Sequence, residues 1–207
     1  MTVAGLLALS PAAMTAQATS GTHHASADTT RSGYTAADVQ FMQGMIAHHA
    51  QALVMSALVP SHTTNPRMHL LAQRIEISQK DEIGLMRRWL EDRNERAPSV
   101  EESHTGHDMA MPGMAMSGPM MPGMLTAAQL AQLASSKGEA FDRLFLRDMI
   151  SHHEGALVMV SDLLATKGAA QDPTVFQYAS DVDADQRAEI ARMRAMLDAD
   201  ARTTQHR

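Results

Sequence analysis

The chain carries one methionine-and-histidine pentad twice, as MIAHH at residues 45–49 and as MISHH at 149–153. On a helix, residues three and four positions apart are neighbours, so the methionine of each pentad lies beside both of its histidines. The sequence ALVM follows each pentad, at 52–55 and 156–159, and adds a second methionine on roughly the same side. Thioether sulfur and imidazole nitrogen together suit soft or borderline metal ions, above all Cu(I), with Ag(I) as a chemical mimic.

Both copies therefore supply candidate metal ligands, although a purely structural interpretation competes with this one. The candidates are Met45, His48, His49 and Met55, and in the second copy Met149, His152, His153 and Met159. Methionine at helical spacing is more often a core residue than a ligand, and a duplicated element also keeps its core residues. Adjacent histidines lie about 100° apart around a helix, so at most one of each pair can point straight inward.

A second repeated pattern, Q-x-x-E-I-x-x-M, occurs at residues 79–86 and 186–193. Glu82 and Met86 are neighbours on a helix and could approach a histidine across the hairpin, and Met193 is the counterpart of Met86. We include both methionines among the candidate ligands. An exposed glutamate more commonly pairs with a nearby arginine, which is the alternative for Glu82.

The segment HTGHDMAMPGMAMSGPMMPGM, residues 104–124, is the stronger candidate for a soft-metal site. Seven of the 18 methionines lie within residues 109–124. Short spacings on a flexible backbone would let two or three thioethers close on one ion, and imidazole can serve Cu(II) as well as Cu(I). The candidate ligands here are His104, His107, Met109, Met111, Met114, Met116, Met120, Met121 and Met124. A low-complexity linker that is rich in methionine by chance is the alternative.

Caps, prolines and glycines divide the chain into four long helical stretches and one short one. The expected limits are Thr35 to Pro60, Pro66 to about Arg93, Gly138 to Gly168 and Asp172 to about Ala201, with the short helix starting at Thr126. Asn65 and Asp172 are the expected N-caps of the second and fourth long helices, and a proline follows each of them.

The two halves of the chain repeat each other. The first long helix matches the third at an offset of 104 residues, and the second matches the fourth at an offset of 107. Neither hairpin alone can bury both of its apolar faces. We therefore expect an all-α, four-helix bundle built from two hairpins, residues 35–94 and 126–203, joined by a flexible Met/His-rich linker over residues 95–125.

The N-terminus favours export. A short apolar run precedes Ala16-Gln17-Ala18, which has the form of a signal-peptidase site, although the first basic residue is only Arg31. We expect a signal peptide over residues 1–18 and a disordered segment over 19–34, and a periplasmic or secreted protein. No other apolar run approaches the roughly 20 residues that a membrane helix needs, so we expect no stable membrane insertion.

Composition excludes several classes of function. The absence of cysteine excludes disulfides, thiolate zinc sites and thiol catalysis, and the scarcity of aromatic residues favours helices. The net charge of −6 without a basic stripe argues against nucleic acid as a partner. We expect no enzyme, because the one Glu-x-x-His match, Glu101 with His104, occurs once and in the linker, and no nucleophile elbow, phosphate loop or H-E-x-x-H occurs.

The pattern D-x-x-F-x-x-x-M-I-x-H-H-x-x-A-x-x-M, followed by Q-x-x-E-I-x-x-M, resembles the bacterial family called domain of unknown function 305. It occurs from Asp38 to Met86 and again from Asp142 to Met193, and the resemblance covers about residues 35–200. It implies a ferritin-like four-helix bundle, exported, in a family whose better-known members look like copper-binding and copper-resistance proteins. The methionines and histidines of the two pentads are the candidate ligands that match the motif.

The two halves are not identical within this motif. Gly44 corresponds to Asp148, and Ala50-Gln51 corresponds to Glu154-Gly155, so two metal sites would be unequal. We expect an exported protein that sequesters, buffers or ferries copper, with Cu(I) favoured, in copper homeostasis or resistance. The metal ion is the expected partner, and another copper-handling protein is a candidate partner. The alternative is an exported helical module whose methionine-rich linker docks a protein without metal.

Overall fold

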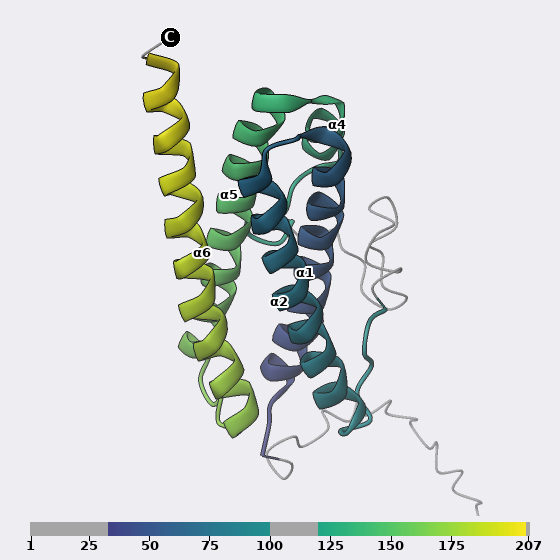
Figure 1. Cartoon of the computed structure of the whole chain (residues 1–207). Coiled ribbons are helices and arrows are strands. Elements are labelled where there is room, and N and C mark those ends of the chain that lie inside the picture. The colour runs from purple at the N-terminus through teal and green to yellow at the C-terminus, as the bar shows by residue number, and fades with distance from the viewer. Residues whose placement is uncertain (1–32, 100–119, 206–207) are drawn as a thin grey trace, which may run out of the picture.

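The computed structural model describes residues 33–99 and 120–205, and the regular structure within these ranges is entirely helical. Four long helices lie side by side as a bundle (Figure 1). They are α1 (Ala36–His62), α2 (Pro66–Glu91), α5 (Gly138–Ala165) and α6 (Pro173–Gln205). The short helix α4 (Ala127–Ser135) packs at one end, against α1 and α5. The expected all-α bundle of two helical hairpins is confirmed.

The expected helix caps are present. Thr35 and Thr126 each form a capping box, with Asp38 and Gln129 respectively, and the side chain of Asn65 accepts a hydrogen bond from the backbone N–H of Arg67. These side chains satisfy backbone donors that the first turn of a helix leaves unpaired, which explains where the helices begin.

The ends of the four long helices differ from their expected limits by two to four residues. Helix α1 continues through Pro60 to His62, where the backbone N–H of Thr63 bonds to the carbonyl of Val59. A proline in the last turn deprives only one carbonyl of its partner, so it does not stop the helix there. Helix α2 ends at Glu91, two residues before the expected limit, and α5 ends at Ala165, three residues before Gly168. Helix α6 extends to Gln205.

A layer of buried polar side chains divides the core into two apolar clusters. One cluster joins the first half of α1 and the second half of α5, and the other joins the second half of α1 and the first half of α5. The two helices are therefore antiparallel. Equivalent residues of the two repeats consequently lie at opposite ends of the bundle. The buried polar layer between the clusters consists of His48, His49, Gln79, His152, His153 and Gln186.

The aspartate that begins each repeated motif ties its hairpin to the other one. The Oδ1 atom of Asp38 accepts a hydrogen bond of 2.7 Å from the backbone N–H of Ala170, in the loop between α5 and α6. The Oδ2 atom of Asp142 accepts one of 2.9 Å from the side chain of Asn65, in the loop between α1 and α2. Both carboxylates are buried, so these bonds act away from water.

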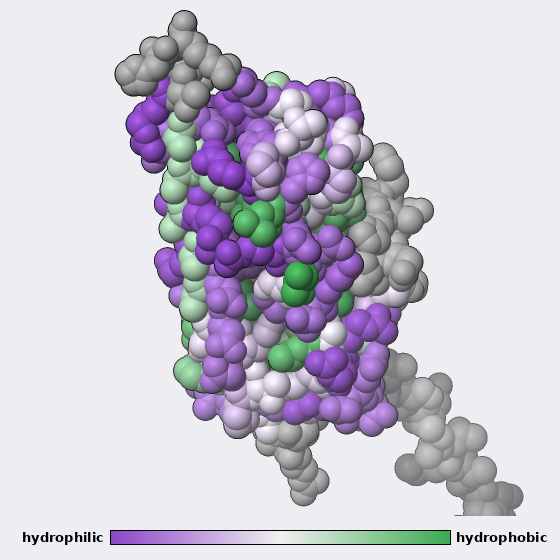
Figure 2. All heavy atoms as spheres, in the orientation of Figure 1, coloured by the Kyte–Doolittle hydropathy of each residue, from purple (hydrophilic) through white to green (hydrophobic). Residues whose placement is uncertain are grey.

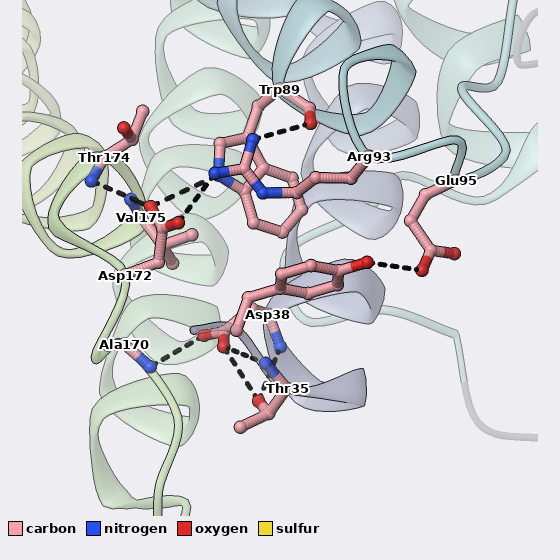
Figure 3. Close-up of polar contacts among 10 residues, drawn as sticks. Thr35, Asp38, Trp89, Arg93, Glu95, Ala170, Asp172, Thr174 and Val175 are labelled. Atoms are coloured by element: carbon pink, nitrogen blue, oxygen red, sulfur yellow. Dashed lines mark hydrogen bonds and ion pairs between the residues drawn. The ribbon is translucent and has the colours of Figure 1, made fainter. Parts of the chain in front are cut away.

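A second link joins α2 to the start of α6 (Figure 3). The guanidinium of Arg93 donates to Asp172 at 2.7 Å and lies over the ring of Trp89, with 4.3 Å from Cζ to the ring centroid. Asp172 also accepts from the backbone N–H groups of Thr174 and Val175, as expected of the N-cap of α6. Burial alone would raise the pKa of Asp172, but these hydrogen bonds outweigh it and lower the pKa.

The visible face of the bundle is mostly hydrophilic, with separate hydrophobic patches (Figure 2). The exposed large hydrophobic side chains of the described residues are Leu70, Ile77, Met120, Val158, Leu164 and Phe176. Among the described helices, none is both long enough and apolar enough to span a membrane.

Replacing Asp38 by alanine is expected to lower the free energy of unfolding by about 2–4 kcal/mol. The variant loses the carboxylate that accepts the backbone N–H of Thr35 in the capping box of α1, and it leaves the buried N–H of Ala170 without a partner. Asp142→Ala is the matched control, because it removes one bond to a side chain and is expected to cost about 1 kcal/mol. Urea unfolding followed by circular dichroism measures both, and equal losses would contradict the assigned role of Asp38.

Candidate metal centre

The two repeats bring one histidine each to the centre of the bundle. His48 of α1 and His152 of α5 occupy equivalent positions, and their ring centroids are 3.8 Å apart with an interplanar angle of 36°. His49 and His153 instead face the second helix of their own hairpins. The 100° between adjacent residues thus separates the roles within each pair, while all four side chains remain buried because a helix covers each direction.

Each outer histidine is held by a glutamate from the repeated Q-x-x-E-I-x-x-M pattern. The Nε2 atom of His49 lies 2.6 Å from Oε2 of Glu82, and the Nε2 atom of His153 lies 2.6 Å from Oε2 of Glu189. The expected approach of Glu82 to a histidine across the hairpin is confirmed. A carboxylate that accepts the N–H of one ring nitrogen fixes the tautomer and makes the other nitrogen a better metal ligand.

Four ring nitrogens in this layer are buried without a hydrogen-bond partner. They are Nδ1 of His48, Nδ1 of His49, Nε2 of His152 and Nδ1 of His153. The Nε2 atom of His48 is 3.0 Å from the carbonyl oxygen of Pro122, which can only accept, so the proton is on Nε2 and the lone pair is on Nδ1. Buried polar atoms are normally paired, and an unpaired lone pair of this kind is available to a ligand.

The two central histidines are neutral at physiological pH. Burial, together with the charges of His49 and His153, lowers the pKa of His48 to about 3, although the hydrogen bond to Pro122 acts in the opposite direction. Burial also lowers the pKa of His152 well below its ordinary value, and the charges of His48 and His153 add to the effect. Neutral imidazole is the form that binds metal ions, so both rings are in a state that allows ligation.

The histidine–glutamate pair of the first hairpin, His49 with Glu82, has Tyr178 as an additional polar neighbour, and the second pair has no equivalent tyrosine. The hydroxyl of Tyr178 lies 3.3 Å from Nε2 of His49, and the repeat places Leu71 at the position of Tyr178. Burial raises the pKa of Tyr178 well above its ordinary value, and so do the charge of Glu82 and a hydrogen bond to it. The phenol therefore stays protonated and donates to the Glu82 carboxylate. The two histidine–glutamate dyads thus have equal bond lengths but different surroundings.

The end of the expected flexible linker is fixed on the bundle. Residues 120–126, here called the strap, cross α5, where the backbone of Gly123 packs against Gly155. The side chain of Gln51 makes two hydrogen bonds to the backbone of Leu125, one through each polar atom of its amide. Together with the bond between Pro122 and His48, these contacts hold the strap over the histidine layer. The expected flexible linker over residues 95–125 therefore extends too far, because a packed, hydrogen-bonded segment already begins at Met120.

The candidate methionines fall into buried and accessible groups. Met45, Met55, Met86, Met149 and Met193 are fully buried in the two apolar clusters. Met121, Met124 and Met159 are half-buried, and Met120 is 53% exposed. The candidates His104, His107, Met109, Met111, Met114 and Met116 lie outside the described residues.

Repeat-equivalent methionines lie at the two ends of the histidine layer. Met45 and Met86 belong to one cluster, with Met159 packed against it. Their counterparts Met149, Met193 and Met55 belong to the other. Within the described part of the chain, no three histidine, aspartate or glutamate side chains are placed to hold one ion together.

Several residues of this centre were missed from the sequence. Gln51, Pro122, Gly123 and Gly155 shape the strap, and Tyr178 extends one dyad. The sequence did contain one signal, since Gln51 and Gly155 occupy equivalent positions and differ. The neighbouring sequence of these residues does not indicate that Gln51 would bond to the strap backbone or that the strap would pack against Gly155.

Acid is expected to destabilise the fold through His48 and His152. Because the folded pKa values are lowered, the unfolded chain binds more protons below about pH 6.5, so stability falls as the pH falls. Each histidine contributes a slope of up to about 1.4 kcal/mol per pH unit. Denaturant unfolding between pH 7.5 and 5 should show this slope, and the double variant His48→Phe, His152→Phe should flatten it. An unchanged slope in the variant would place the acid sensitivity elsewhere.

Gly155→Ala is expected to displace the strap and lower stability by about 2–3 kcal/mol. The new Cβ would lie 2.0 Å from the carbonyl oxygen of Pro122, so the bonds to His48 and Gln51 would be lost together. The control is Gly84→Ala on α2, whose Cβ would meet only the flexible end of Arg88. It should stabilise by about 0.5–1 kcal/mol, since alanine favours a helix. Chemical denaturation compares the two, and stabilisation by both would exclude a tight contact at Gly155.

Comparison with known sequences places both pentads within one family. The model of the family DUF305, a domain of unknown function, matches residues 38–197. Uncharacterized protein L153 of Acanthamoeba polyphaga mimivirus is 43% identical over 56 residues, 27% of this chain and 37% of that protein. The chain thus spans 37% of the length of this curated relative.

Solved structures of similar fold cover most of the chain. A DUF305 protein of Streptomyces coelicolor is 26% identical, over 79% of this chain and 91% of that one, with a TM-score of 0.65. A DUF305 fragment from Deinococcus radiodurans is 28% identical, over 80% and 98%, with a TM-score of 0.64. CopM in its Cu(I)-bound form is 27% identical, over 78% and 96%, with a TM-score of 0.57. With both motif copies inside the matched range, the chain belongs to the DUF305 family.

Proposed function

We propose that this protein binds Cu(I) through methionine and histidine and thereby sequesters, buffers or ferries copper. The observation that carries the proposal is the layer of four buried imidazoles with unpaired ring nitrogens, placed between two equivalent sets of methionines. A core that served packing alone would gain stability by replacing such unpaired polar groups with apolar ones. The glutamates on His49 and His153 are the hydrogen-bond partners typical of metal-binding histidines.

The similar structures support the same class of ligand. CopM has been solved in Cu(I)-bound and Ag-bound forms, the latter at 25% identity to this chain. Both ions are soft and monovalent, which is the chemistry that a mixed thioether and imidazole set selects. The methionines of residues 109–116 would add further thioether ligands, as their sequence spacing suggests.

We further propose that the protein binds metal without catalysing a reaction and that it is located outside the cytoplasm. Export is supported by the apolar run before Ala16-Gln17-Ala18 and by the Streptomyces coelicolor relative, which is presented as a secreted protein. Methionine suits an oxidising compartment, since it offers soft sulfur that does not form disulfides. We place the protein in copper homeostasis or resistance, with another copper-handling protein as its candidate partner.

The test is a titration of the full chain with Cu(I), without oxygen and against a competing chelator. We expect tight binding that weakens at least tenfold in the double variant His48→Phe, His152→Phe. A second variant replaces Met109, Met111, Met114 and Met116 by leucine, and its loss of bound Cu(I) measures how much of the binding depends on these methionines. Substitution is preferable to deleting residues 104–124, because that deletion would remove part of the strap on His48.

The matched control for the double histidine variant is Leu70→Ala with Ile77→Ala, which changes two exposed side chains of α2 instead of two buried ones. It should bind copper as the parent does. Circular dichroism establishes that each variant is folded. No binding by the parent chain would overturn the proposal, and the search for a function would then turn to a protein partner of the methionine-rich segment.

A further inference from the structure

Two accessible methionines from distant parts of the chain meet over a single glycine. A Cβ atom on Gly44 of α1 would lie 3.6 Å from Sδ of Met121, on the strap, and 3.4 Å from Cε of Met159, on α5. Both thioether ends therefore lie within van der Waals distance of one point. Because glycine has no side chain, that point is not filled by the residue beneath it.

Unlike the candidate methionines of the core, these two methionines are not fully buried. Met121 and Met159 are half-buried, whereas Met45, Met55, Met86, Met149 and Met193 are fully buried. Met121 and Met159 therefore lie nearer the surface than the methionines of the core. Partial burial also restricts the rotamers of both side chains, so less entropy is lost when they hold an ion.

The strap fixes Met121 in place. Its neighbour Pro122 accepts the hydrogen bond from His48, and the backbone N–H of Met124 bonds to the carbonyl of Met121. His48 lies one helical turn beyond Gly44 on α1. The thioether pair is thus positioned directly beside the histidine layer, through bonds that are independent of any metal.

The repeat does not produce a second such pair. The counterpart of Gly44 is Asp148, and the counterpart of Met159 is Met55, which is fully buried. At the position equivalent to Gly155, where the strap crosses, Gln51 carries a side chain that is bonded to Leu125. The strap can therefore approach only one of the two equivalent faces, and the second repeat has no counterpart of the pair over Gly44.

From this geometry we infer a soft-metal site formed by Met121 and Met159 over Gly44, which takes Cu(I) or Ag(I) at the edge of the bundle. The inference rests on the proposed function and adds to it a defined entry site, separate from the buried imidazoles. Two thioethers leave further coordination positions of the ion open, which suits exchange with another ligand.

The experiment follows methionine methyl groups in the full chain during a titration with Ag(I). The chain carries leucine at positions 109, 111, 114 and 116, and its remaining methionines are labelled with ¹³C at the methyl group. Single Met→Leu variants assign the resonances. We expect the signals of Met121 and Met159 to shift together with the first equivalent of Ag(I). Met120→Leu is the matched control, since this neighbouring methionine is more exposed and lies outside the pair.

Each variant then has a definite expectation. Met121→Leu and Met159→Leu should each abolish the shift of the other residue and weaken Ag(I) binding at least tenfold, while Met120→Leu should change neither. Gly44→Ala should keep or raise the unfolding midpoint, because alanine fits at 3.4 Å and favours a helix, yet weaken binding by filling the space. Such opposite effects on stability and affinity would not follow from a structural role.

The outcomes separate this inference from the proposed function. If the chain binds Ag(I) while the signals of Met121 and Met159 stay in place, the entry site is wrong and the copper function stands. If Gly44→Ala binds as tightly as the parent, the space over Gly44 is not part of the site. If neither this chain nor the parent binds Ag(I) or Cu(I), both proposals fail.

Discussion

Burying four imidazoles at the middle of a bundle is the constraint that the rest of the structure must satisfy. A charged imidazole would be far too costly there, so His48 and His152 remain neutral and lie against each other. His49 and His153 are accommodated differently, each through a short bond to a glutamate from the partner helix. The apolar clusters on either side supply the burial that keeps this layer intact.

The internal repeat explains how such a layer can be built from one short pattern. Each hairpin contributes a central histidine, an outer histidine and the glutamate that holds it, and the antiparallel arrangement brings the two sets together. The same symmetry uses Asp38 and Asp142 to tie each hairpin to the loop of the other. The repeated pattern therefore packs the helices together, links each hairpin to the other and places the buried histidines and their glutamates.

The strap breaks this symmetry, and it does so where the repeats differ in sequence. Gly155 admits its backbone and Gln51 binds it, although the two residues occupy equivalent positions. Only His48 of the two central histidines bonds to the strap, and only the first hairpin has Gly44 at the surface beneath Met159. Under the proposed function, the buried layer would be the rigid part of a copper protein, and the strap side its exchangeable part.

Much of the fold was accessible from the sequence because its signals are local. Helix caps, the proline that follows Asn65 and the spacing of apolar residues act within a few positions, and all of them predicted the hairpins correctly. Pro60 was misjudged because its effect depends on how near the helix end lies. The expectation that Glu82 could approach a histidine followed from hairpin geometry, which is also nearly local.

By itself, the sequence determined the duplicated hairpins, their antiparallel helices and the methionine and histidine side chains that they carry. Only the tertiary structure decided which histidines face each other, which methionines remain open to solvent and where the methionine-rich segment becomes fixed. These features depend on contacts between residues about a hundred positions apart, such as His48 with His152 and Gly44 with Met121 and Met159. No local propensity encodes such contacts, since they arise from how closely two backbones pack once both hairpins have formed.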